Sequence, residues 1–247
     1  MADPASRIRL RLSCPDPRAT ADFLERALGF ERTSPNTLTC GQQPVELVPG
    51  KAGAAPVAVL VPCNDLAFQH FAIATHDIEA AHTRLRSAGG WTPISLDGPV
   101  LLPERSGGAC AFKFRNPDGH PLELIQFPHG NAKRIDHTAI CVSDTARSIA
   151  FYRRFGFEPG RTNLNHGSEQ DTLDGLTGVR VEVTPLARPA SGAPHLELLC
   201  YRSPEPVATG VADGSPLATV TVIDPDGAAL LDPDGHRLVA RIPEPNP

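Results

Sequence analysis

Two histidines lie in segments that read as β-strands and could bind a metal ion or transfer protons. His70 belongs to the segment 68–75 and His137 to the segment 136–144. Because side chains alternate across a strand, each segment has two faces. In both segments the histidine shares its face with small residues, and bulky apolar residues occupy the other face. A helix can cover the bulky face, and the small residues leave room for a ligand beside the imidazole.

Two glutamates follow the same rule. Glu123 and Glu197 each stand between two leucines in a Leu-Glu-Leu segment. Burying an unpartnered carboxylate costs several kcal/mol. Two imidazoles and two carboxylates that converge on one cation would remove that cost, and the set suits Zn²⁺, Mn²⁺, Fe²⁺, Co²⁺ or Ni²⁺ without selecting among them. Taken singly, each glutamate also fits an exposed face or a pair with arginine.

The elements that must position these side chains recur along the chain. We expect four units, at 7–50, 66–128, 134–202 and 216–243, each of which begins with a strand and a helix and ends in a hairpin. Asp16, Asp77 and Asp144 are expected helix N-caps, and the helices after the last two should span 78–88 and 145–155. The fourth unit is too short to hold a helix.

Two turns of the same sequence feed the last strands of the second and fourth units. Each contains Pro-Asp-Gly followed by a histidine, His120 or His236, and this composition favours a tight turn. We expect both histidines at the surface or at a strand start, without a catalytic role. The four units group as two domains, an N-terminal pair at 1–130 and a C-terminal pair at 131–247.

The repeated pattern resembles the vicinal oxygen chelate superfamily, which includes glyoxalase I, extradiol dioxygenases and bleomycin-resistance proteins. The resemblance implies an α+β fold of βαβββ units, whose mixed, curled sheets form half-barrel clefts, with the last unit truncated. A divalent metal would there meet neighbouring oxygens of a small-molecule substrate. The residues that carry the resemblance are Phe68-Gln-His-Phe-Ala-Ile73, Asp136-His-Thr-Ala-Ile140, Ser148-Ile-Ala-Phe-Tyr152, Arg115-Asn-Pro-Asp-Gly-His120 and the two Leu-Glu-Leu strands.

The pairing of the units decides the ligand set. If the two middle units face each other, they bring together His70, Glu123, His137 and Glu197. If consecutive units pair, as is usual in the family, one site would hold His70, Glu123 and Glu46. His137 and Glu197 would then form a second, poorer site. The sequence leaves both arrangements open.

Further polar residues are candidates for substrate contacts. His166 and Gln170 lie in a polar segment, 165–170, which reads as a loop before a strand. Tyr201 shares the face of Glu197 and could reach the same cavity, although core packing fits it equally well. Glu46, the terminal carboxylate of the first unit, completes this set.

The resemblance leads to two enzyme chemistries. In both, the metal acts as a Lewis acid on two neighbouring substrate oxygens. In the glyoxalase version Glu123 or Glu197 leaves the metal and serves as the proton-transferring base. In the dioxygenase version two histidines and one glutamate hold iron, with His166 and Tyr201 as the candidate acid–base pair. The alternatives are a metal-free small-molecule binder of the bleomycin-resistance kind and a structural role.

Composition excludes several other classes. The chain of 247 residues has a net charge of −5 and no basic stripe, so nucleic acid is a poor candidate partner. It has no apolar run of membrane-spanning length and no secretory start, and its six cysteines lack metal-site or redox spacing. We therefore expect a cytoplasmic protein without a membrane partner, and the oligomeric state is left open, a homodimer included. The aromatic content of 5% slightly weakens the drug-binding alternative.

Overall fold

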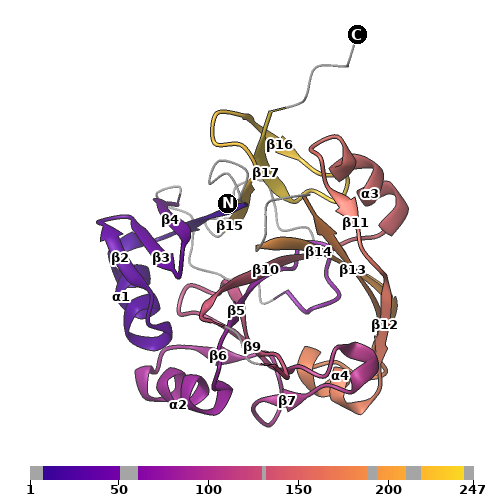
Figure 1. Cartoon of the computed structure of the whole chain (residues 1–247), viewed down its shortest axis with the longest axis horizontal. Helices are drawn as coiled ribbons and strands as arrows, with labels where there is room; N and C mark the ends of the chain where they lie inside the picture. Colours follow the sequence, from indigo (N-terminus) through magenta and orange to yellow (C-terminus); the bar gives the residue numbers. More distant parts are fainter. Residues whose placement is uncertain (1–7, 51–60, 130–131, 189–193, 210–217, 242–247) are drawn as a thin grey trace.

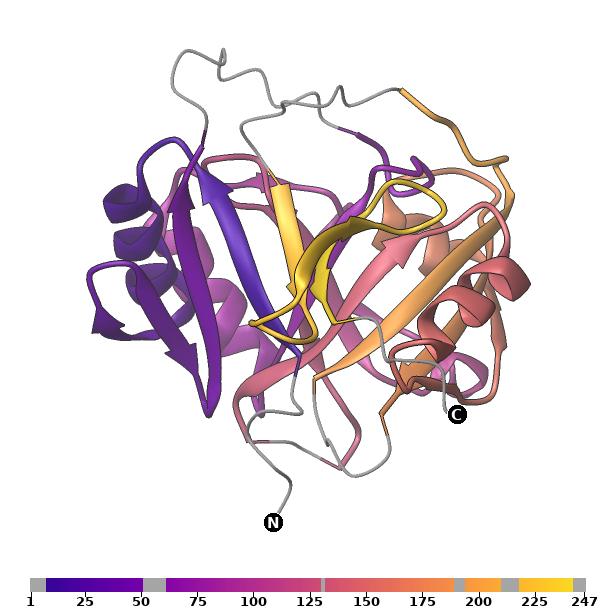
Figure 2. The ribbon, with the colours of Figure 1, turned by 90° about the horizontal axis from the view of Figure 1, so that it is seen from above.

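The computed structural model describes residues 8–50, 61–129, 132–188, 194–209 and 218–241 (Figures 1 and 2). The first half of the chain contains two units. Unit one consists of β1 (Arg9–Cys14), α1 (Pro17–Leu28), β2 (Glu31–Ser34), β3 (Thr37–Cys40) and β4 (Gln43–Pro49). Unit two consists of β5 (Gln69–Ala74), α2 (Ile78–Ala88), β6 (Thr92–Pro93), β7 (Val100–Leu101), the 3-10 turn η2 (Glu104–Ser106), β8 (Cys110–Arg115) and β9 (Pro121–Gln126).

The second half contains a longer and a shorter unit. Unit three consists of β10 (Arg134–Cys141), α3 (Thr145–Arg153), β11 (Glu158–Pro159), β12 (Asn163–His166), α4 (Ser168–Asp174), β13 (Arg180–Ala187) and β14 (His195–Ser203). Unit four consists of β15 (Ala218–Val222), β16 (Ala228–Leu231) and β17 (Arg237–Ala240), with no helix among its described residues. The predicted α+β class, the repeated units and the truncated last unit are thus confirmed.

In each of the first three units, the helix that follows the first strand has the predicted aspartate as its N-cap. Asp16 accepts hydrogen bonds from the first-turn amides of α1, and Asp77 and Asp144 accept from one such amide each in α2 and α3. These side chains satisfy amides that have no partner inside the helix, which fixes where each helix begins. α2 has the predicted bounds, and α3 ends two residues before the expected position.

Each unit closes in the same way. The first strand of every unit pairs in parallel with the last strand: β1 with β4, β5 with β9, β10 with β14, and β15 with β17. Units then join through their first strands, which pair antiparallel: β1 with β15 and β5 with β10. The result is a seven-stranded sheet from units one and four and a ten-stranded sheet from units two and three.

The apolar cores are shared differently from the sheets. One core joins the helix-covered faces of units one and two, and the other joins units three and four. Accordingly, α1 and α2 lie against each other on one side of the molecule and α3 lies on the other (Figure 2). Each sheet therefore connects the first half of the chain with the second half, whereas each of these two cores lies mainly within one half. The domain boundary at residue 130 stays a prediction.

The ten-stranded sheet curves from β8 and β9 through β5, β10 and β14 to β13 and β12 (Figure 1). α4 bridges its two edges, because it contacts β12 on one side and β7 and β8 on the other. The expectation of a loop at 165–170 was wrong: His166 ends β12, and Gln170 lies in α4. None of the helices in the described ranges is long and apolar enough to cross a membrane.

The two turn histidines stand immediately before β9 and β17, which is the strand-start position of the two expected placements, and both are buried rather than at the surface. His120 Nε2 lies 2.9 Å from the carbonyl oxygen of Ser13 at the end of β1, and His236 Nε2 lies 2.8 Å from that of Cys141 at the end of β10. Each ring nitrogen must donate, because a carbonyl only accepts. The turn of unit two is thus hydrogen-bonded to the first strand of unit one, and the turn of unit four to the first strand of unit three.

We expect His120→Phe to destabilise the protein by about 1–3 kcal/mol, because the partly buried Ser13 carbonyl loses its donor. His120→Gln, which can still donate from a similar position, should recover part of this loss. Urea denaturation of the two variants measures the effect, and His236→Phe provides the equivalent test in the other half. A His120→Phe variant as stable as the wild type would contradict the assigned role.

The same histidine predicts a pH dependence of stability. Burial lowers the pKa of His120 below its ordinary value, although the charge of Asp118 and the bond to Ser13 oppose the shift. A lowered pKa in the folded state means that the stabilisation is present above the unfolded pKa of about 6.5 and is lost as the pH falls through the folded pKa. The free energy of unfolding should therefore fall between about pH 7 and pH 5 more steeply in the wild type than in His120→Gln.

Candidate functional site

The four predicted ligands lie on four neighbouring strands of the ten-stranded sheet, in the order β14, β10, β5, β9. Glu197, His137, His70 and Glu123 come from these strands in turn, and all four side chains point to the concave face. The middle units therefore share one site, which answers the question that the sequence left open.

The register of the strands explains how these side chains can meet. Ala72 lies in register with both Glu123 and His137, and Ala139 lies in register with both His70 and Glu197. Each long side chain thus has an alanine beside it on the neighbouring strand. The space above these two methyl groups lets the imidazoles and carboxylates lean toward a common centre.

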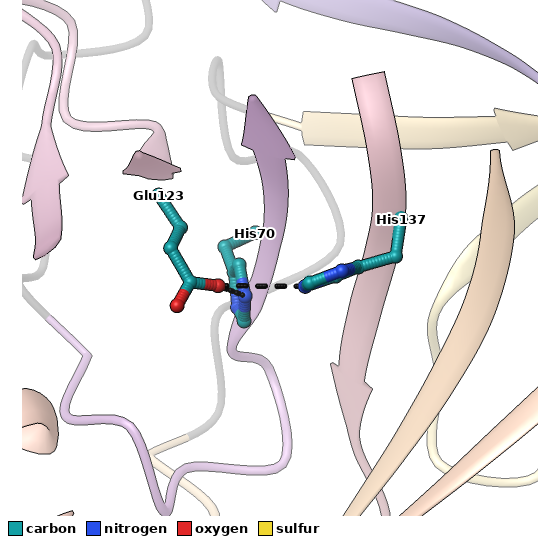
Figure 3. A group of neighbouring side chains, drawn as sticks. All are labelled: His70, Glu123 and His137. Carbon is teal, nitrogen blue, oxygen red and sulfur yellow. Dashed lines mark hydrogen bonds and ion pairs between the residues drawn. The ribbon is translucent and has the colours of Figure 1, made fainter. Parts of the chain in front are cut away.

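The distances show that they do so (Figure 3). Glu123 Oε2 lies 2.9 Å from His70 Nε2 and 3.4 Å from His137 Nε2. The ligand atoms of these three residues all lie within 4.8 Å of one another. Glu197 Oε2 lies 3.7 Å from His137 Nε2, so it borders this group of three on the side of His137.

The charges of the cluster oppose the effect of burial. Burial disfavours ionisation of Glu123, but hydrogen bonds from His137 and His70 outweigh it and hold the pKa of Glu123 well below its usual value. Burial also disfavours the imidazolium form of His137, yet the charge of Glu197 and bonds to Asp136 and Glu123 raise the pKa of His137 well above its ordinary value. For His70 burial prevails, and its pKa is lowered. The carboxylates thus attract a positive charge to the centre.

Two residues that the sequence reasoning missed support the cluster. Asp136 Oδ2 lies 3.2 Å from His137 Nδ1, and His195 Nε2 lies 3.1 Å from Glu197 Oε1. A carboxylate at Nδ1 keeps the proton of a neutral imidazole there and leaves Nε2 free to bind a metal. His195 stands two residues before Glu197, so the alternation of the strand could have indicated it.

The donor set fits a divalent metal ion. Two imidazole nitrogens and two carboxylates, one of the imidazoles backed by Asp136, form the kind of set that binds first-row divalent metals. His70 Nδ1 is buried and has no hydrogen-bond partner in the described part of the chain, so it lacks a comparable support.

The cluster opens into a cavity of about 710 Å³ between the sheet and α4. Besides these four side chains, further polar residues line it at the end where α4 meets β8 and β14: Lys113, Gln170 and Tyr201. Lys113 stands alone among apolar neighbours in its strand, which was a usable signal in the sequence. All three side chains are hydrogen-bonded to Asp174, and no pattern in the sequence indicated this residue.

The structure separates the remaining candidates. Gln170 and Tyr201 line the cavity, but the Tyr201 hydroxyl donates to Asp174. His166 is absent from the described lining, and its carbonyl accepts from Arg105. Glu46 lies in the other sheet, half-exposed and 2.9 Å from Arg11 Nε, so the alternative site of His70, Glu123 and Glu46 does not form.

Comparisons with known proteins agree with this fold. Glyoxalase I from Zea mays is 20% identical, with a TM-score of 0.58 over 94% of this chain and 91% of the maize chain. A substituted form of the maize enzyme is 18% identical, with a TM-score of 0.57 over 94% and 91% of the two chains. At this level of identity the likeness shows a shared fold. Among curated proteins, no sequence matches.

A family model describes most of the chain. The model of the Glyoxalase/Bleomycin resistance protein/Dioxygenase superfamily matches residues 8–124 and 134–229, which together include nearly all of units one to three, the first part of unit four and all four clustered side chains. The repeated strand–helix pattern, the sheet that joins the middle units and this match have one explanation: the chain belongs to the glyoxalase, bleomycin-resistance and dioxygenase superfamily.

Proposed function

We propose that the protein is a metal-dependent enzyme of the glyoxalase type, which acts on a small molecule with two neighbouring oxygens. The observation that carries the proposal is the convergence of His70, Glu123 and His137 from three adjacent strands in one cavity. Glu197, on the next strand, lies beside His137 and lines the same cavity. Among the described residues, none from the seven-stranded sheet, which we call the outer sheet, belongs to this cluster.

His70, Glu123 and His137 are the residues we assign as firm ligands, with Glu197 as the fourth. A divalent cation, such as Zn²⁺, Mn²⁺, Fe²⁺, Co²⁺ or Ni²⁺, would supply Lewis-acid polarisation of the two substrate oxygens. The chain itself must then hold the substrate, exclude water and move a proton between carbon atoms.

Glu197 is the carboxylate best placed to move that proton. Its side chain is 20% exposed, whereas that of Glu123 is 6% exposed and lies between both imidazoles. Burial raises the pKa of Glu197, but the charge of His137 and the bond from His195 outweigh this and lower it. Glu197 is therefore ionised at neutral pH and can accept a proton from a substrate held beside it.

The arrangement supports this chemistry better than ring cleavage. The dioxygenase version needs an acid–base histidine and a tyrosine at the substrate, for which His166 and Tyr201 were the candidates. His166 lies outside the described cavity lining, and the Tyr201 hydroxyl is bound to Asp174. A carboxylate beside two imidazoles suits proton transfer.

One observation favours a second candidate, a metal-free binding protein. His70 and Glu123 already form a hydrogen bond of 2.9 Å, which would satisfy both groups without a metal.

The six cysteines are free thiols, five of them buried, and this fits our placement of the protein in the reducing cytoplasm.

Counting metal ions tests the proposal. Protein produced without a metal-chelating tag and dialysed should hold about one divalent ion per chain by elemental analysis, because four ligands converge on one centre. His70→Ala and His137→Ala should each empty this site, whereas Glu46→Gln should retain the ion. A wild type that stays empty after addition of Mn²⁺, Zn²⁺ or Fe²⁺ would favour the metal-free binder.

Proton transfer by Glu197 can be measured without the natural substrate. In D₂O, the metal-loaded protein should accelerate exchange of the carbon-bound hydrogens of hydroxyacetone, followed by proton NMR. Glu197→Gln should slow this exchange by about 10²–10⁴-fold, the usual contribution of a general base, while the metal stays bound. Glu46→Gln, in the other sheet, is the matched control. Exchange in Glu197→Gln at the wild-type rate would show that another group is the base.

A further inference from the structure

The polar end of the cavity is built around one buried carboxylate. Asp174, at the end of α4, accepts from Lys113 Nζ at 2.7 Å through Oδ1. Its Oδ2 accepts from Gln170 Nε2 and from the Tyr201 hydroxyl, both at 2.9 Å. Lys113 and Gln170 therefore bind the two oxygens of the same carboxylate and lie side by side, and both line the cavity.

These bonds fix the orientation of the Gln170 amide. A carboxylate only accepts hydrogen bonds, so the amide nitrogen must face Asp174 and the amide oxygen must point away from it. Gln170 is buried, and its Oε1 has no hydrogen-bond partner within the described structure. A buried acceptor without a partner costs about 1–3 kcal/mol, and a ligand donor that reached this oxygen would remove that cost.

The ammonium group of Lys113 has unused donors beside that oxygen. An ammonium group offers three hydrogen bonds, and among the described residues Lys113 Nζ makes the single bond to Asp174. Lys113 lies in register with Glu123 across β8 and β9, so its side chain stands next to the metal-binding cluster on the concave face.

The helix that carries Gln170 is held firmly. The carbonyl of Leu173 accepts from the Ser95 hydroxyl at 2.8 Å, and the amide of Leu96 donates to Thr172 at 2.9 Å. Gly175, which ends α4 with a positive φ of 63°, packs so closely that a Cβ there would lie 2.4 Å from the carbonyl oxygen of Ile94. The donor on Lys113 and the acceptor on Gln170 are thus fixed before a ligand arrives.

We propose that Lys113 and Gln170 form a specificity subsite for a neutral group that both accepts and donates a hydrogen bond, an amide or an alcohol, on the substrate. Its oxygen would accept from Lys113 and its N–H or O–H would donate to Gln170. A carboxylate could accept from Lys113 but would bring a lone pair against the Gln170 oxygen. Asp174 is a positioning residue that holds both groups. The inference rests on the proposed function for the place of the substrate's paired oxygens.

A matched series of catechols tests the subsite, because each presents two neighbouring oxygens and differs in one substituent. The probes are 3,4-dihydroxybenzamide, 3,4-dihydroxybenzyl alcohol, 3,4-dihydroxybenzoate and 4-methylcatechol, titrated by calorimetry into metal-loaded and EDTA-treated protein. The amide or the alcohol should bind about tenfold more tightly than the benzoate, since the cost of a mismatched buried acceptor corresponds to a change of that order. The tighter of the two identifies the preferred group.

Variants separate the subsite from a general change in the cavity. Gln170→Met keeps the length of the side chain but removes the acceptor, and it should bring the amide and benzoate affinities to within about threefold of each other. Tyr201→Phe should keep the preference, because that hydroxyl bonds to Asp174 and not to the ligand. Lys113→Met alone would leave a buried unpaired carboxylate and destabilise the fold. Lys113→Met/Asp174→Asn, which removes both charges, should therefore be used, and it should lose the preference over 4-methylcatechol.

Three results would overturn the proposal: equal binding of all four probes, benzoate binding as tightly as the amide in the wild type, or the same loss of preference in Tyr201→Phe as in Gln170→Met. The metal count keeps the two proposals apart. If the protein binds no metal but the EDTA-treated form keeps the order of probes, the proposed enzyme function fails and the subsite stands. If metal binds and the order is absent, only the subsite fails.

Discussion

The site depends on the close approach of four long polar side chains over two alanines. Ala72 and Ala139 occupy the positions between the imidazoles and carboxylates on neighbouring strands. A larger residue at either position would fill the space into which Glu123 and His137, or His70 and Glu197, extend. The parallel strand pairing inside each middle unit and the antiparallel pairing between the two units place each alanine in register with these long side chains.

Burial of so many charged groups requires mutual compensation. Glu123, Glu197 and Asp136 surround His137, and each carboxylate has an imidazole within bonding or near-bonding distance. Leaving one of these carboxylates alone in the interior would cost several kcal/mol. At the other end of the cavity, Asp174 is compensated by Lys113, Gln170 and Tyr201. The concave face therefore holds two groups of charged side chains, each of which is compensated within the group.

The outer sheet repeats the architecture without the chemistry. Units one and four pair through β1 and β15 as units two and three pair through β5 and β10. On this sheet Arg11 pairs with the half-exposed Glu46, and the described residues of unit four supply no comparable histidine or glutamate. The buried turn histidines, His120 and His236, show that the structural role of the repeat was retained in both halves.

The sequence alone predicted the repeated units, the starts of three helices and the four side chains that the proposed site contains. The aspartate N-caps fixed the helix starts, the alternation of small and bulky residues fixed which face of each strand is concave, and the Leu-Glu-Leu segments marked Glu123 and Glu197. These signals are local, because they depend on neighbours within a few residues. Only the tertiary structure decided that the middle units share a sheet, that Glu46 lies apart, and that α4 carries Gln170 and Asp174 across to Lys113. Strand pairing between distant segments and the docking of a short helix depend on contacts 60 or more residues apart, such as Lys113 with Asp174, for which no local pattern exists.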